Sequence, residues 1–282
     1  MTRVLASTVL LGATLVASAQ IVTDGTLGAA GALTGPDFAI PDTLGQTRGG
    51  NLFHSFAQFN LAAGETATFS GPAEIQNVIA RVTGGSASTI DGALTCDIAG
   101  ANFFFINPFG VIFGPNAQVN VSGAFAATTA DYVKLADGGR FDARTPANDV
   151  LTTAPVSAFG FLGPSAGDIT IQSASLPIGA GGAVSFVGGD VRTEAAAYVQ
   201  APGSRLVIVA TDSAGELAYD PVDPPVNLDL TPFAVLGRVD LLAGSGFDTS
   251  GDGRGRITLD AQNITIRDLS FLLALNFGAL AG

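Results

Sequence analysis

The sequence contains very few of the side chains on which most catalytic, metal and nucleic-acid sites depend. It has one histidine, one cysteine, one methionine and no tryptophan, and only 13% of its 282 residues are charged. One histidine and one cysteine exclude an ordinary zinc site, and a single cysteine excludes an internal disulfide. Lys134 is the only lysine, and acidic residues outnumber basic ones by 24 to 12, so no basic cluster exists that could follow a phosphate backbone. The sequence therefore predicts no metal, no cofactor and no nucleic-acid partner.

Helix signals are also scarce, because no window longer than about ten residues keeps a 3.6-residue apolar period free of Gly or Pro. Gly occurs 37 times, and short segments that alternate apolar and polar residues take the place of helices. Their ends carry Gly, Asn, Asp or Pro, which is typical of strands joined by tight turns. The clearest segments are 75–82, 118–122, 168–172, 183–187, 205–210, 238–242, 256–260 and 263–267. The chain is therefore predicted to be all-β.

The stretch NPFGVIFGPN, residues 107–116, places two Pro-and-Gly corners close together. Asn107, Pro108 and Gly110 occupy positions i, i+1 and i+3 of a four-residue segment, which is the residue preference of a type I turn. Type I turns splay the strands of a hairpin, so the apolar segments on either side are interpreted as successive sides of a coil. Residues 103–122 then form one rung, with three short strands and two corners. This is the unit of a parallel β-helix, a solenoid in which stacked rungs share one core.

The predicted fold is a right-handed parallel β-helix with an N-terminal cap and small extra-helical β elements. An open end of such a rod invites aggregation, so residues 20 to about 45 are expected to contribute to the cap. The Pro-rich stretch at about 211–236 is interpreted as a loop excursion from the helix. The last, apolar stretch of about 12 residues is too short to span a bilayer. Either the rod continues in a longer protein or its last rung is exposed.

The N-terminus has the features of a secretory signal peptide. Arg3 gives a positive start, residues 4–16 are apolar, and Ala17-Ser18-Ala19 is a small-x-small cleavage site. The apolar stretch is too short for a spanning helix. The chain is therefore expected to leave the cytoplasm and not to be an integral membrane protein.

The isolated polar residues favour structural interpretations over catalytic ones. His54 could serve a serine nucleophile as base, but no G-x-S-x-G elbow or other Ser motif accompanies it, which favours a structural histidine. Cys96 is interpreted as a small core residue rather than a reactive thiol. The segment 248–255 begins like a calcium loop, but Leu259 stands where the bidentate Glu is needed, which favours a Gly-rich corner.

Parallel β-helices also include enzymes that cleave acidic polysaccharides, so an enzyme stays open as an alternative. The acids that could converge on one face are Asp91 with Asp97, or Asp137 with Asp142 around Arg140. Acids this sparse on a rod are usually solvated surface, and the fold alone is no argument for catalysis. No catalytic residue is assigned. A purely structural surface protein is the other alternative.

Three segments resemble the N-terminal secretion domain of the filamentous haemagglutinin family, the exported partner in two-partner secretion. They are residues 51–72, 75–94 and 101–132, in order and without large gaps, and they cover about a third of the chain. The family's NPNG motif falls on Asn107, Pro108 and Gly110, with Phe109 in place of its second Asn. The family's second Asn-Pro motif finds no match here. Segments 159–163, 185–191 and 201–210 are similar to the first β-helix repeats that follow this domain in the family.

The resemblance implies an adhesin-type exoprotein, secreted or displayed on the surface of a Gram-negative-type bacterium. It would pass through the periplasm and cross the outer membrane through a β-barrel two-partner secretion transporter, whose periplasmic domains recognise the secretion domain. Host-cell, matrix or carbohydrate ligands are the further partners that such a protein would have. The expected organisation is a signal peptide at 1–19, the secretion domain at 20–145 and further β-helix rungs at 146–282.

The turn at Asn107, Pro108 and Gly110 is the surface that we expect the transporter to recognise. The turn is expected to be exposed, so Asn107→Ala should cost at most about 1 kcal/mol of stability, as surface substitutions usually do. Export should then suffer more than folding.

Overall fold

The computed structural model describes residues 21–164, 166–172, 175–178, 182–221, 223–225, 227–252 and 255–278. The predicted signal peptide at 1–19 lies outside these residues. Within them the only helical elements are two short 3-10 turns, η1 (Asp42–Leu44) and η2 (Pro146–Asn148). None of the described helices is long and apolar enough to cross a membrane.

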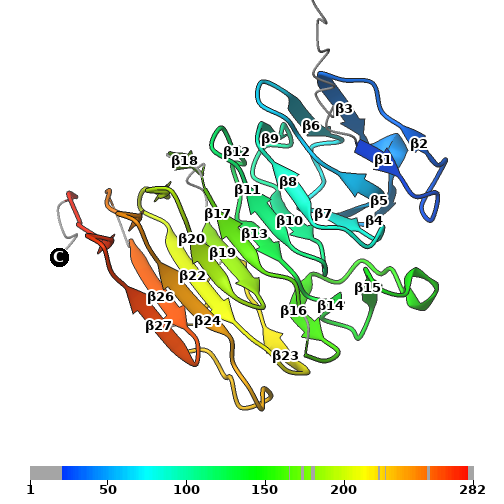
Figure 1. Cartoon of the computed structure of the whole chain (residues 1–282). Coiled ribbons are helices and arrows are strands. Elements are labelled where there is room, and N and C mark those ends of the chain that lie inside the picture. The colour runs from blue at the N-terminus through cyan, green and yellow to red at the C-terminus, as the bar shows by residue number, and fades with distance from the viewer. Residues whose placement is uncertain are drawn as a thin grey trace, which may run out of the picture.

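The largest sheet stacks one strand from each successive rung in parallel, as Figure 1 shows along the length of the molecule. From the N-terminal end these strands are β5 (Asn51–Phe59), β7 (Asn77–Val82), β10 (Asn102–Ile106), β13 (Phe125–Thr128), β19 (Ala183–Gly188), β22 (Arg205–Ala210) and β26 (Arg256–Asp260).

A second parallel sheet forms the next side of the rungs. It contains β8 (Ser88–Ile90), β11 (Val111–Phe113), β17 (Ile169–Ile171), β20 (Val191–Thr193), β24 (Arg238–Leu241) and β27 (Asn263–Ile266).

The third side is divided into two parallel sheets. One contains β3 (Asp37–Pro41), β6 (Thr66–Ser70), β9 (Ala93–Cys96) and β12 (Gln118–Asn120), and the other β18 (Leu176–Pro177), β21 (Tyr198–Gln200), β25 (Gly246–Asp248) and β28 (Phe271–Leu273). A parallel bridge between Val119 and Ile178 joins the two. The predicted parallel β-helix is therefore confirmed. The rung expected at 103–122 is made of β10, β11 and β12, and each of the eight segments predicted as strands overlaps one.

Antiparallel strands cover the N-terminal end of the largest sheet. β1 (Ile21–Thr23) pairs antiparallel with β5 and with β2 (Gly31–Ala32), and β4 (Gln46–Arg48) also pairs antiparallel with β5. These strands occupy the edge that β5 would otherwise leave open, which is the role expected of the cap. β3 differs from the others because it pairs in parallel with β6 and so belongs to a rung.

A four-stranded antiparallel sheet lies outside the coil. Its order is β15 (Arg140–Asp142), β14 (Tyr132–Leu135), β16 (Val156–Phe161) and β23 (Gly215–Ala218). The first three strands belong to residues 132–161, which we call the excursion. They leave the coil after β13, which still pairs directly with β19 on the far side of the excursion. β23 comes from the stretch interpreted as a loop at about 211–236. These are extra-helical β elements of the predicted kind.

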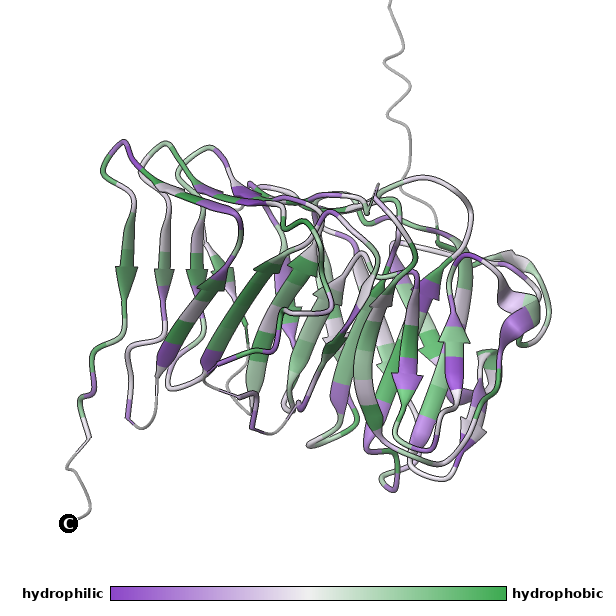
Figure 2. Cartoon of the chain, turned by 90° about the horizontal axis from the view of Figure 1, so that it is seen from below, coloured by the Kyte–Doolittle hydropathy of each residue, from purple (hydrophilic) through white to green (hydrophobic). Residues whose placement is uncertain are grey.

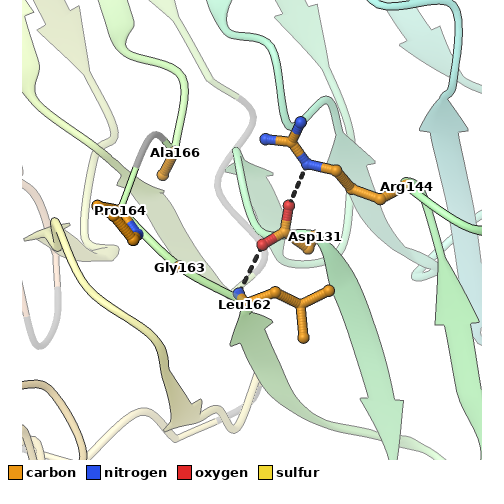
Figure 3. Close-up of a pocket in the computed structure, with 6 residues that line it drawn as sticks. All are labelled: Asp131, Arg144, Leu162, Gly163, Pro164 and Ala166. Carbon is orange, nitrogen blue, oxygen red and sulfur yellow. Dashed lines mark hydrogen bonds and ion pairs between the residues drawn. The ribbon is translucent and has the colours of Figure 1, made fainter.

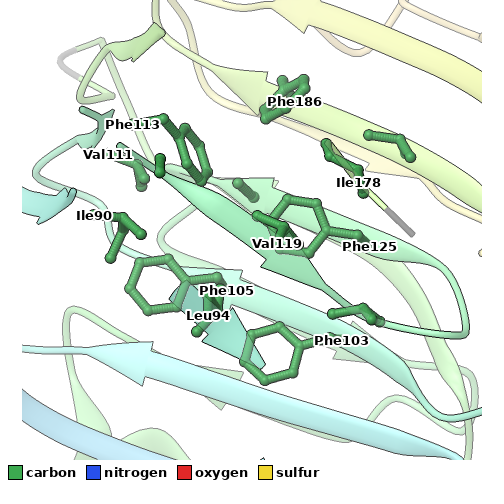
Figure 4. Packing of buried hydrophobic residues seen from close by; sticks show 14 of the residues in the cluster. Ile90, Leu94, Phe103, Phe105, Val111, Phe113, Val119, Phe125, Ile178 and Phe186 are labelled. Atoms are coloured by element: carbon green, nitrogen blue, oxygen red, sulfur yellow. The ribbon is translucent and has the colours of Figure 1, made fainter. Parts of the chain in front are cut away.

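Two hydrophobic clusters explain the apolar run Phe103 to Ile106. Phe103 and Phe105 point into the coil and pack with Phe113, Phe125, Phe186 and other interior side chains, as Figure 4 shows. Phe104 and Ile106 belong to a second cluster, which also contains Val133 and Phe159 of the antiparallel sheet. Because successive side chains of a strand face opposite sides, β10 must be apolar on both faces when both are covered. In Figure 2 hydrophobic residues, coloured green, recur along the stacked strands.

Candidate functional site

The predicted turn forms, and it is held by the side chain of its first residue. The backbone N–H of Gly110 donates to the carbonyl of Asn107 at 3.1 Å, which is the hydrogen bond of a β-turn. The Asn107 Oδ1 accepts from the N–H of Phe109 at 3.0 Å, and its Nδ2 donates to the carbonyl of Ser86 and to the Ser88 Oγ, each at 3.0 Å. The turn is therefore tied to the preceding rung.

The next rung packs against the other side of the turn. Gly167 N–H donates to the Pro108 carbonyl at 2.9 Å. Gly110 has φ +121°, and a Cβ there would approach the Asp168 carbonyl to 3.1 Å, so this corner requires glycine. Asn107 has no exposed surface, and Pro108 and Gly110 are also buried. The expectation of an exposed turn is therefore wrong, because stacked rungs cover these residues from both sides.

A pocket of about 260 Å³ lies where the excursion returns to the coil (Figure 3). Arg144 belongs to the excursion and contacts the turn, since its guanidinium carbon lies 4.6 Å from the centre of the half-buried Phe109 ring. The Arg144 Nε donates to the Asp131 carboxylate, whose other oxygen accepts from the N–H of Leu162 at 2.6 Å. Gly163, Pro164 and Ala166 complete the lining.

Leu162 is the exposed apolar residue of this region, with 54% of its surface accessible. Arg144 therefore contacts the half-buried Phe109 ring and lines the same pocket as Leu162, and we call these three residues the turn-side surface. The sequence gives no signal for Arg144 or Leu162, because they lie 35 and 53 positions after Phe109 and only the path of the excursion brings them to it.

His54 is fully buried in β5, against the rings of Phe56 and Phe69. Neither of its ring nitrogens has a hydrogen-bond partner among the described residues, and burial lowers its pKa to about 4. The structural interpretation is therefore favoured. Cys96 is likewise buried in the core of the coil, and burial raises the pKa of its thiol.

Asp137 and Asp142, two of the acids named in the sequence, lie in different surroundings. Asp142 is fully buried and accepts from Arg140 Nη2 at 2.6 Å, whereas Asp137 is exposed and accepts from Gly139 N–H and the Thr152 hydroxyl. No group of three or more His, Cys, Asp or Glu residues in the described chain is placed to hold a metal ion.

In the calcium-like stretch 248–255, residues 253 and 254 lie outside the described part. Asp248 accepts from the Tyr198 hydroxyl at 2.5 Å and from Ser250 N–H at 2.7 Å. Its carboxylate is therefore already engaged by neighbouring protein groups.

Comparisons with known proteins find chains that are similar to this one. A curated relative, the heme/hemopexin-binding protein of Haemophilus influenzae, is 37% identical over 81 residues, which are 29% of this chain and 8% of that protein. A solved structure described as the filamentous hemagglutinin secretion domain is 16% identical, with a TM-score of 0.43, over 84% of this chain and 92% of that one.

A family model describes most of the chain. The model of the TPS secretion domain, the domain of two-partner secretion exoproteins, matches residues 19–259. The match includes every residue of the turn-side surface and continues through the excursion into the later rungs. The chain belongs to the TPS secretion domain family.

Proposed function

We propose that the described domain directs export of the chain, through recognition by the periplasmic domains of an outer-membrane β-barrel transporter. The observation that carries this proposal is the family match over residues 19–259. The chain would reach the periplasm by its signal peptide and would then be secreted or displayed at the surface as an adhesin-type protein. A polysaccharide-active enzyme and a purely structural surface protein are the alternatives.

We further propose that the turn-side surface is the part of the domain that the transporter reads. Asn107, Pro108 and Gly110 are buried, so a partner has no direct access to their side chains. Their role in recognition would be to fix the position of Phe109 between them. Leu162 supports this choice, because an exposed leucine beside an aromatic ring and a guanidinium is the composition of a protein-binding patch.

The experiment is an export assay with the transporter from the same genome co-expressed. The test variant carries Phe109→Ser and Leu162→Ser together, and the matched control carries Val235→Ser, which removes another apolar side chain that is 45% exposed. Burial of one such side chain in an interface is worth about 1.5–3 kcal/mol, so binding to the purified periplasmic domains should weaken at least about tenfold.

The expected result is a larger periplasmic fraction and a smaller secreted fraction for the double variant, while the control is exported like the parent. Circular dichroism and thermal melting of both purified variants establish that they are folded. Export and binding at the parental level would rule out the turn-side surface as the recognition site. Release that does not depend on the transporter in the parent chain would rule out the export function itself.

A further inference from the structure

A second and larger pocket, of about 380 Å³, lies between the outer face of the coil and the antiparallel sheet. Side-chain amides from the coil line one side, and residues 155–157 of the excursion line another, together with the segment that follows β23. We call it the amide pocket. Its residues come from three separated parts of the sequence, and its volume is within the range of small-molecule sites.

The amides belong to a ladder that runs from rung to rung. Asn77 Nδ2 donates to the Asn51 Oδ1 at 2.8 Å, and Asn102 Nδ2 donates to the Asn77 Oδ1 at 2.9 Å. The Asn51 Nδ2 donates to the carbonyls of Thr152 and Ala154, which fixes the excursion against the coil. The ladder therefore holds the walls of the pocket in place before any ligand arrives.

The ladder leaves hydrogen-bonding capacity in the lining. Asn77 and Asn102 each use one of two amide N–H groups, and the exposed Gln76 side chain makes no hydrogen bond among the described residues. Ser157 adds a hydroxyl, and Tyr219 adds a phenol that is 7% exposed and accepts from Ser185 Oγ.

The chemistry of the lining selects against anionic ligands. Among the described residues that line the amide pocket, Asp220 is the only charged one, and the chain as a whole carries a net charge of −12. An anion would be repelled, whereas amides, hydroxyls and one carboxylate are the groups that donate to and accept from sugar hydroxyls. Pro155 and Pro221 supply apolar surface for the faces of a sugar ring.

The pocket is suited to binding rather than cleavage. Glycoside hydrolysis ordinarily uses two carboxyl groups that flank the scissile bond. Asp220 carries the only carboxyl group of the described lining, so the second carboxyl group that hydrolysis needs is not found there.

We propose that the amide pocket is a binding site for an uncharged saccharide of one or two sugar units. The site is separate from the turn-side surface and does not depend on the proposed role in export.

The test is saturation-transfer NMR on the purified full chain, with cellobiose, lactose and N,N′-diacetylchitobiose as uncharged probes and a glucuronate-containing disaccharide as the anionic probe. Gln76→Ala removes an exposed amide of the lining, and Gln118→Ala removes an exposed amide from another sheet as the matched control. Ala136→Trp fills the pocket from an exposed position and leaves the ladder intact.

At least one uncharged probe should bind at millimolar concentration. Gln76→Ala should weaken it about 3- to 10-fold, the effect of one lost hydrogen bond, while Gln118→Ala leaves it unchanged. Ala136→Trp should abolish binding without lowering the melting temperature. The proposal is overturned if none of the uncharged probes binds, if the anionic probe binds equally well, or if the folded Ala136→Trp variant binds like the parent.

Discussion

Asn107→Ala should destabilise the folded chain by about 2–4 kcal/mol. The substitution removes three side-chain hydrogen bonds, to Ser86, Ser88 and the backbone of Phe109. Each is worth about 0.5–1.5 kcal/mol net. Because Asn107 has no exposed surface and Ser88 is also buried, water has little access to replace these bonds, and the Ser88 hydroxyl loses a partner inside the protein. The cost is therefore well above the value of about 1 kcal/mol typical of an exposed turn residue.

Urea denaturation of the purified variant, followed by circular dichroism, measures this cost as a lower midpoint. Asn116→Ala is the matched control, because Asn116 lies at the next corner of the same rung and is exposed, with side-chain bonds to Asp91 of 3.2 and 3.3 Å. Its variant should lose at most about 1 kcal/mol. Equal midpoints for the two variants would refute the inference that the Asn107 side chain holds the turn between the rungs.

Two further predictions concern buried charge. Arg81→Leu should lower the free energy of unfolding by about 3–5 kcal/mol in the same assay. Arg81 is fully buried with its Nη1 2.7 Å from the Asp149 carboxylate, and removing the guanidinium leaves that carboxylate without its ion-pair partner. A loss below about 1 kcal/mol would contradict this. His54 has a folded pKa of about 4 against 6.5 for the free side chain, so the unfolded state binds more protons between these values. Stability should therefore fall as pH drops from about 6.5 to about 4, by roughly 3 kcal/mol from this residue. His54→Phe should flatten that slope, and an unchanged slope would contradict the assignment.

The fold could be read from the sequence because its information is local and repeated. Alternating segments bounded by Gly and Asn predict strands wherever they occur, and the NPFG preference predicts a turn that does not suit a hairpin. The apolar residues Phe104 and Ile106 were harder to explain, since an isolated coil would expose them. In the structure Val133 and Phe159 of the excursion cover these two residues. No local sequence pattern indicates that the excursion folds back onto the coil.

The candidate site was only partly predictable for the same reason. A turn depends on four adjacent residues, and the hydrogen bond from Gly110 N–H to the Asn107 carbonyl confirms that this one forms. Burial of the turn depends on Ser86 and Ser88 in one neighbouring rung and on residues 167–168 in the other, some 20 and 60 positions away. Arg144 reaches Phe109 across the same excursion. Long-range stacking, rather than local preference, determines which side chains a partner can reach.

The Arg81 network shows that the parts of the domain fold interdependently. Arg81 donates to Ser55 in the first rung, to Thr26 in the cap and to Asp149 in the excursion, and its guanidinium lies 4.0 Å from the centre of the Phe141 ring. A buried guanidinium is costly until all of these partners are present. The cap and the first rungs therefore reach full stability only when the excursion has docked.

The turn-side surface has the same requirement, because Phe109 belongs to the coil whereas Arg144 and Leu162 follow from the excursion. A transporter that reads this surface must meet a chain that is folded through residue 162. Arg81→Leu, which loosens the docking of the excursion, should then weaken binding to the periplasmic domains even though Arg81 is itself buried. A transporter that binds the unfolded chain would instead bind the Arg81→Leu variant as tightly as it binds the parent. Comparing this variant with the Phe109 and Leu162 double variant therefore distinguishes recognition of a folded surface from recognition of an extended segment.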